Sequence, residues 1–113
     1  MSGGAPAAAG VVDLDREAVK QGLADGSMLL VDVREDHEFA AGHIPGSVSH
    51  PLSRFDPSTL PRAEGQQVVF SCAAGVRSVR AIELARVAGL KLDAHYRGGF
   101  KDWAMAGEAI AFD

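Results

Sequence analysis

The sequence predicts a small α/β protein whose sheet is mostly parallel. Two short apolar runs, residues 28–33 and 68–72, are typical of strands that are buried on both faces. Segments with helical spacing follow both runs, and such alternation favours a single α/β layer structure. A chain of 113 residues is long enough for one domain with its own hydrophobic core.

The first half of the chain contains one clear strand between two helical segments. Residues 11–12 begin a short strand, and Asp15 lies where a helix N-cap is expected. The pair Asp25-Gly26 ends this helix, and the strand 28–33 follows. A short helical piece then carries Arg34 and Glu38 four residues apart. It stops at Gly42, and no helix can run through Ile44-Pro45-Gly46, because proline cannot continue a helix.

The second half repeats the alternation of strand and helix. Residues 51–62 contain three prolines, so no more than a turn or two of helix fits there. The helix 78–88 is expected to turn Val79, Ile82 and Ala85 inward and to end at Gly89. The other expected elements are strands at 47–50, 68–72 and 92–96 and a final short helix at 100–105.

Composition and charge exclude several classes of function. The chain is 47% hydrophobic and 23% charged, and its formal net charge of −4 gives no reason to expect nucleic-acid binding. No apolar stretch approaches the roughly 20 residues that a membrane helix requires. Residues 1–10 lack the features of a signal peptide and are expected to form a flexible tail before a domain at 11–113. With one cysteine and therefore no internal disulfide, a cytoplasmic protein is expected.

The single cysteine, Cys72, is the strongest indication of function. It ends the apolar run 68–72, directly before the helix expected at 78–88. A thiol on a strand-to-helix turn meets converging backbone N–H groups, which stabilise a thiolate. Active sites of parallel α/β proteins also gather at the carboxyl ends of their strands. Cys72 is therefore a candidate nucleophile.

The residues after Cys72 suit a loop that binds an anion. Gly75 can adopt a positive φ, so the backbone can fold closely around the sulfur. The neighbouring apolar residues leave their amides available to form an anion nest. Arg77 could brace this loop or meet an anionic substrate, and Ser78 could bond to the sulfur or cap the helix. The expected substrate-binding residues are Ala73, Ala74, Gly75, Val76, Arg77 and Ser78.

A buried core cysteine is the competing interpretation, because free cysteine is among the most buried residue types. The glycine and arginine that follow Cys72 count against it, since a core cysteine needs neither. An arginine at a helix start is also disfavoured by the helix dipole, which favours a functional role for Arg77.

Three motifs in the chain resemble those of the rhodanese (sulfurtransferase) family. The first comprises Asp-Val-Arg at 32–34, Glu-Phe at 38–39 and Gly-His-Ile-Pro-Gly-Ser at 42–47. The second is the strand and Cys-x-x-Gly-x-Arg-Ser loop at 69–78. The third comprises Gly-Gly-Phe at 98–100, Trp103 and Ala-Gly at 106–107. The resemblance covers roughly residues 11–112 with the motifs in the family's order.

The resemblance implies a rhodanese-like fold with a five-stranded, mostly parallel sheet and helices on both faces. It also implies ping-pong transfer of a sulfane sulfur from thiosulfate or a persulfide donor, through a persulfide on Cys72, to a thiophilic acceptor. Such covalent catalysis splits one transfer into two easier steps. No metal or organic cofactor is required. The implied partners are small sulfur donors and acceptors or a protein thiol or persulfide, and the oligomeric state stays open.

Two other functions fit the sequence less well than sulfur transfer does. A phosphatase or arsenate-reductase loop has one more residue between cysteine and arginine than the four that separate Cys72 from Arg77. A non-catalytic rhodanese-fold binding module usually lacks the cysteine or has an altered loop.

Several thiosulfate-using members carry Arg, Lys or Gln in the two positions after the cysteine, where this chain has Ala73-Ala74. We therefore expect weak thiosulfate affinity and a persulfide donor.

The other matched residues are expected to be structural. Asp32, Arg34 and Glu38 should form a partly buried ion-pair set at the exit of the second strand. His43 should make a satisfied hydrogen bond near Pro45, and no histidine lies at metal-ligand spacing from the cysteine. Two further residues complete the expectations: Trp103 should belong to the core, and Arg54 is a possible edge of the pocket.

Overall fold

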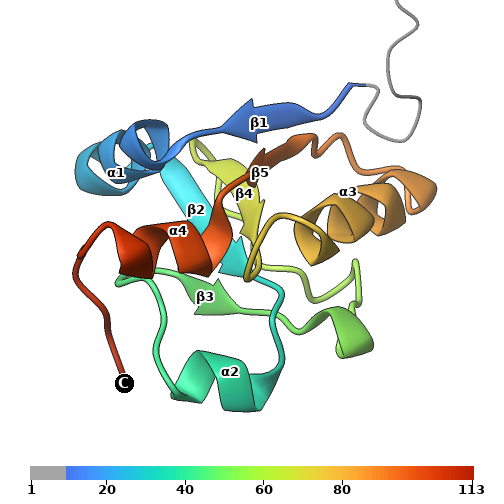
Figure 1. Cartoon of the computed structure of the whole chain (residues 1–113). Helices are drawn as coiled ribbons and strands as arrows, with labels where there is room; N and C mark the ends of the chain where they lie inside the picture. Colours follow the sequence, from blue (N-terminus) through green and yellow to red (C-terminus); the bar gives the residue numbers. More distant parts are fainter. Residues whose placement is uncertain (1–9) are drawn as a thin grey trace, which may run out of the picture.

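The computed structural model describes residues 10–113, and its centre is one five-stranded sheet in which every pair of neighbouring strands is parallel. The strand order is β1-β5-β4-β2-β3, so strands from the two ends of the chain are neighbours (Figure 1). The strands are β1 Val12–Leu14, β2 Met28–Asp32, β3 Val48–Ser49, β4 Gln67–Ser71 and β5 Ala94–Tyr96. The predicted fold class is confirmed. The tail expected at 1–10 lies, except for Gly10, outside the described residues.

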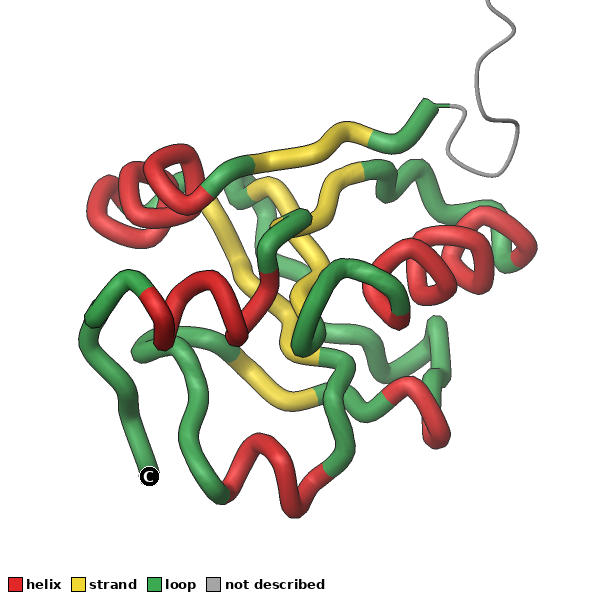
Figure 2. The backbone as a smooth tube through the Cα atoms, viewed as in Figure 1, coloured by secondary structure: helices red, strands yellow, loops and turns green. Residues whose placement is uncertain are grey.

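Helices cover both faces of the sheet (Figure 2). Residues of α1 and α4 belong to one buried cluster, and residues of α3 belong to the other. A 3-10 turn, Leu52–Arg54, lies in the proline-rich segment, as the sequence predicts. The α-helices are α1 Arg16–Asp25, α2 Asp36–Ala40, α3 Arg77–Val87 and α4 Gly99–Met105. None of the helices within residues 10–113 is long and apolar enough to cross a membrane.

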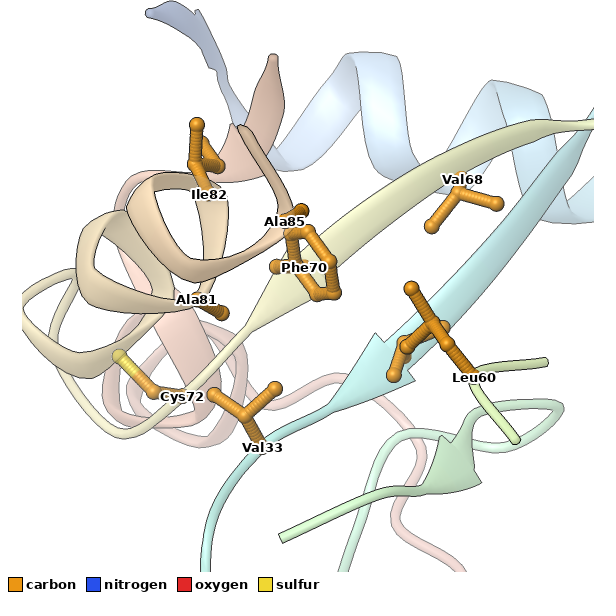
Figure 3. Close-up of a cluster of buried hydrophobic side chains, with 9 residues drawn as sticks. Val33, Leu60, Val68, Phe70, Cys72, Ala81, Ile82 and Ala85 are labelled. Carbon is orange, nitrogen blue, oxygen red and sulfur yellow. The ribbon is translucent and has the colours of Figure 1, made fainter. Parts of the chain in front are cut away.

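The central strand β4 places its side chains alternately in the two cores. Phe70 is fully buried with Ile82 and Ala85 of α3, whereas Val69 is fully buried in the cluster that contains Val19 of α1. A strand covered on both faces must be apolar at successive positions, which explains the continuous apolar run. Figure 3 shows the α3 side of this core, which ends at the cysteine after β4.

The helix boundaries follow from local chemistry. Asp15 caps α1, because its side chain accepts a hydrogen bond from the Ala18 N–H at 2.9 Å. Helix α3 begins after Val76 without a side-chain cap, one residue earlier than predicted, and ends before Ala88, whose neighbour Gly89 has a φ of +85°. Its fully buried face consists of Ser78, Ala81, Ile82 and Ala85. Val79, expected to face inward, is only partly buried.

Candidate functional site

Cys72 directly follows β4 at its carboxyl end, as the sequence predicts. Its residue is only 1% exposed, and its sulfur points toward the first turn of α3 (Figure 3). The carboxyl ends of β2 and β5 lie at the same edge of the parallel sheet, on either side of β4. The cysteine is thus both a member of the core cluster and part of the edge where active sites form.

The Cys72 sulfur receives hydrogen bonds from the loop and from the start of α3. The Gly75 N–H donates to Sγ at 3.1 Å, and the Ser78 N–H donates at 3.4 Å. The Ser78 hydroxyl lies 3.5 Å from Sγ. Burial by itself raises the pKa of the thiol, but the hydrogen bonds from Ser78, Ala74 and Gly75 outweigh it. The pKa of Cys72 therefore lies below its ordinary value.

The loop holds this shape because two glycines allow close backbone approaches. Gly75 has a φ of +86°, and a side chain there would collide with the carbonyl oxygen of Arg97. Gly99 begins α4 with a φ of +65°, and a Cβ there would lie 2.5 Å from the Cys72 carbonyl oxygen. The next amide, Phe100 N–H, donates to that same oxygen at 2.8 Å. Helix α4 thereby anchors the cysteine loop from its carbonyl side.

Arg77 is bound to a carboxylate from another element. Its Nη1 and Nη2 donate to Oε1 and Oε2 of Glu38 in α2 at 2.7 and 3.0 Å. This hydrogen bonding lowers the pKa of Glu38 to about 2 and raises that of Arg77. The two terminal nitrogens of the guanidinium, which could otherwise bind an anion, are thus hydrogen bonded to Glu38. Of the two roles expected for Arg77, the geometry favours bracing the loop.

The expected set of Asp32, Arg34 and Glu38 divides into two pairs. Asp32 and Arg34 form a buried pair, with Arg34 Nη2 donating to Asp32 Oδ2 at 2.8 Å. Arg34 Nη2 also donates to the Gly42 carbonyl at 2.8 Å, and the guanidinium lies 4.4 Å from the centre of the Phe100 ring. Glu38 accepts instead from Arg77. One pair lies at the exit of β2, and the other holds the cysteine loop.

The outer surface of the loop is apolar and open. Ala74 and Val76 are exposed, whereas Ala73 and Gly75 are intermediate and Cys72 itself is buried. The Ala73 and Ala74 side chains bring no charge to this surface.

The remaining predicted residues occupy structural positions. His43 is buried, with its ring nitrogens bonded to the Phe39 carbonyl and to Asp113. Trp103 is 5% exposed and belongs to the core on the α1 and α4 face, as expected. Arg54 pairs with Asp36 at 3.0 Å on the exposed side of α2.

Two polar residues near the cysteine were missed by sequence reasoning. His95 in β5 lies with its Nδ1 2.7 Å from Ser78 Oγ, and its Nε2 lies 2.7 Å from Asp13 Oδ1 in β1. The available signal was a histidine in the middle of an otherwise apolar strand, which requires polar partners when buried.

Comparison with known proteins agrees with this geometry. A family model described as a rhodanese-like domain matches residues 15–106. An uncharacterized Synechocystis protein, slr1261, is 40% identical over 96 residues, which cover 85% of this chain and 54% of that protein. The chain thus spans about half the length of that relative.

Two further similar proteins are named as sulfurtransferases. Human thiosulfate:glutathione sulfurtransferase is 34% identical over 95 residues, covering 72% of this chain and 83% of that protein. The structure of a human single-domain sulfurtransferase, TSTD1, matches with a TM-score of 0.69 and 30% identity, covering 90% of this chain and 97% of that one. Because the family model matches most of its length, the chain belongs to the rhodanese-like domain family.

Proposed function

We propose that the protein is a sulfurtransferase that carries a sulfane sulfur as a persulfide on Cys72. The observation that supports this most strongly is the environment of Sγ. At the end of a strand, this sulfur accepts hydrogen bonds from the Gly75 and Ser78 N–H groups, and the pKa of its thiol is lowered. A cysteine that only fills the core needs no such donors. The proposed catalytic domain extends over 11–113, since β1 begins before the segment that the family model matches.

The reaction consists of two displacements at sulfur. The Cys72 thiolate attacks the outer sulfur of the donor, a new S–S bond forms, and the donor's own bond to that sulfur breaks. With thiosulfate the leaving group is sulfite, and the terminal sulfur on Cys72 carries the negative charge. The amides that stabilise the thiolate are placed to stabilise this charge too. An acceptor thiolate or cyanide then takes the outer sulfur and releases the Cys72 thiolate.

A persulfide is the better-supported donor. Thiosulfate is a dianion, but Ala73 and Ala74 bring no charge, and Arg77 is occupied by Glu38. Binding of thiosulfate therefore depends mainly on backbone amides, so its affinity should be weak. The relative named as a thiosulfate:glutathione sulfurtransferase supports a small thiol as acceptor. As the chain has one cysteine, the sulfur passes from Cys72 to another molecule. A reducing cytoplasm would keep the Cys72 thiol free of disulfide bonds.

Intact-mass spectrometry tests this function directly. Wild-type protein incubated with a persulfide donor should gain about 32 Da, one sulfur atom, and lose it again when a thiol acceptor is added. Cys72→Ser should gain nothing, and its sulfur transfer to cyanide should fall to background. A wild-type protein that gains no mass with either thiosulfate or persulfide would indicate the non-catalytic binding module instead.

A further inference from the structure

A chain of buried side chains leads from the cysteine to the surface, and the sulfur displacements described above do not use it. Ser78 Oγ lies 3.5 Å from Cys72 Sγ and 2.7 Å from His95 Nδ1. The other ring nitrogen, His95 Nε2, lies 2.7 Å from Asp13 Oδ1. Ser78 and His95 are 0% and 2% exposed, whereas the Asp13 side chain is 53% exposed. Polar contacts therefore run without a break from the buried Cys72 sulfur to a side chain that is exposed to solvent.

The sheet itself places these groups on one face. His95 is paired with Asp13 of β1 in the parallel register, and with Phe70 of β4 on its other side. Side chains at paired positions of neighbouring parallel strands point to the same face of the sheet. For His95 that face is the one covered by α3, because Ser78 belongs to α3.

The donor and acceptor roles along this chain follow from the carboxylate at its end. An ionised Asp13 can only accept, so His95 Nε2 carries the hydrogen. In the neutral ring Nδ1 is then an acceptor, and the Ser78 hydroxyl donates to it. The Ser78 oxygen keeps a lone pair free, which can accept the hydrogen of the Cys72 thiol. Every hydrogen in the chain therefore points from the thiol toward the surface.

We propose that Ser78, His95 and Asp13 form a proton relay that takes the proton of the Cys72 thiol before it attacks the sulfur donor. The S–H bond breaks and its proton bonds to Ser78 Oγ, while the former Ser78 hydroxyl proton bonds to His95 Nδ1. The products are a thiolate and an imidazolium, with no proton gained or lost by the protein. Asp13 stays ionised and accepts from His95 Nε2. Ser78 touches the reacting sulfur, and His95 and Asp13 act through it as positioning residues.

The charges around the three relay residues favour this proton transfer. Asp13 on β1 supplies the negative charge that stabilises an imidazolium at His95, by a hydrogen bond to a charged acceptor. On the α3 side, the positive Arg77 interacts with the thiolate, while Glu38 of α2 balances that arginine. Asp32, at the end of β2, is neutralised by Arg34. The Asp13 side chain is 53% exposed, so the outer end of the relay is accessible to water.

Ultraviolet titration of the thiolate tests the relay. Because Cys72 is the only cysteine, the absorbance difference from Cys72→Ser reports one thiolate, whether or not sulfur is transferred. His95→Asn can still hydrogen bond to Ser78 but cannot take up a proton. Its thiolate midpoint should rise by about one pH unit, so persulfide formation slows about tenfold at neutral pH and recovers in alkali. An unchanged midpoint would overturn the relay.

Two more variants separate the relay from a structural role. Asp13→Asn keeps an acceptor for His95 on an exposed side chain but removes the charge, so the midpoint should rise in the same direction; no rise would also overturn the proposal. The Asp13→Asn variant tests the relay even if His95→Asn does not fold. His43→Asn is the matched control. This buried histidine bonds to a carbonyl and a carboxylate, whereas His95 bonds to a hydroxyl and a carboxylate, and the thiolate midpoint of Cys72 in this variant should equal that of wild type.

The relay rests on the proposed function, but the two can fail separately. A wild-type protein that forms no persulfide would remove the function and leave the titration interpretable. A persulfide that forms normally, with the same pH profile in His95→Asn and wild type, would remove the relay alone.

Discussion

Glu38 connects the stability of the protein to pH through one ion pair. Its pKa falls from 4.5 to about 2, chiefly through the hydrogen bonds from Arg77. A carboxyl whose pKa is depressed by folding stabilises the protein above its unfolded pKa, and this contribution is lost as pH falls through the folded value. We expect Glu38→Gln to lower the free energy of unfolding by about 1–2 kcal/mol at neutral pH, since the half-buried pair is partly screened. Urea denaturation between neutral pH and pH ~2 measures this, and the difference from wild type should shrink below about pH 4.5.

The control for this prediction is an exposed ion pair. Glu83 pairs with Arg80 at 3.2 Å, with side chains 42% and 59% exposed. Glu83→Gln should change the free energy of unfolding by less than about 0.5 kcal/mol. If Glu38→Gln and Glu83→Gln lowered the free energy of unfolding equally, the ion pair between Arg77 and Glu38 would have no special stabilising role.

At the scale of elements, the start of α4 determines where the cysteine loop lies. A Cβ at residue 99 would lie 2.5 Å from the Cys72 carbonyl oxygen and 2.6 Å from that of Ala73, at a φ of +65°. Gly99→Ala should therefore lower the free energy of unfolding by about 2–4 kcal/mol, through strain plus this clash. It should also slow persulfide formation in the protein that remains folded, because α4 pushes the loop away from its place. Urea denaturation and single-turnover mass spectrometry measure the two effects.

Gly107 provides the matched control, since its φ is +76° and nothing lies within 4 Å of a Cβ built there. Gly107→Ala carries the conformational strain without the clash, so its cost should be about 1 kcal/mol and persulfide formation should not change. If both alanine variants lost the same stability and activity, contact between α4 and the loop would not be the cause.

At the scale of the whole molecule, stability comes from the two cores and the chemistry from one edge of the sheet. Val69 is fully buried in the core on the α1 and α4 face, whereas Val87 on α3 is 88% exposed. Val69→Ala should lower the free energy of unfolding by about 2 kcal/mol, since it leaves a cavity. Val87→Ala should change it by less than about 0.5 kcal/mol. Denaturation measures both, and in the folded state neither variant should move the thiolate midpoint of Cys72.

Much of the fold follows from local patterns. The apolar runs at 28–33 and 68–72 became the buried strands β2 and β4, and Asp15 caps α1 as its position predicts. Periodicity was less reliable on α3, where Ser78 rather than Val79 lies on the fully buried face. Burying a serine is favourable there because its hydroxyl has partners, and a pattern of apolar residues alone does not reveal them.

The partners of His95 and Arg77 could not be predicted from the sequence. His95 and Asp13 are 82 positions apart and meet only because β1 pairs with β5. Arg77 and Glu38 meet across 39 positions because α2 packs near the start of α3. Such contacts depend on strand order, which long-range packing decides and local propensity does not.

The sequence by itself determined that a thiol ends a buried strand and is followed by a glycine turn and a helix. Those features depend on backbone preferences and hydrophobic pattern within a few residues of Cys72. Only the tertiary structure decided that Arg77 braces the loop and that Ser78 connects the sulfur to His95. The reason is physical: hydrogen bonds and charges act over a few ångströms in space, and folding alone brings these distant residues within that range.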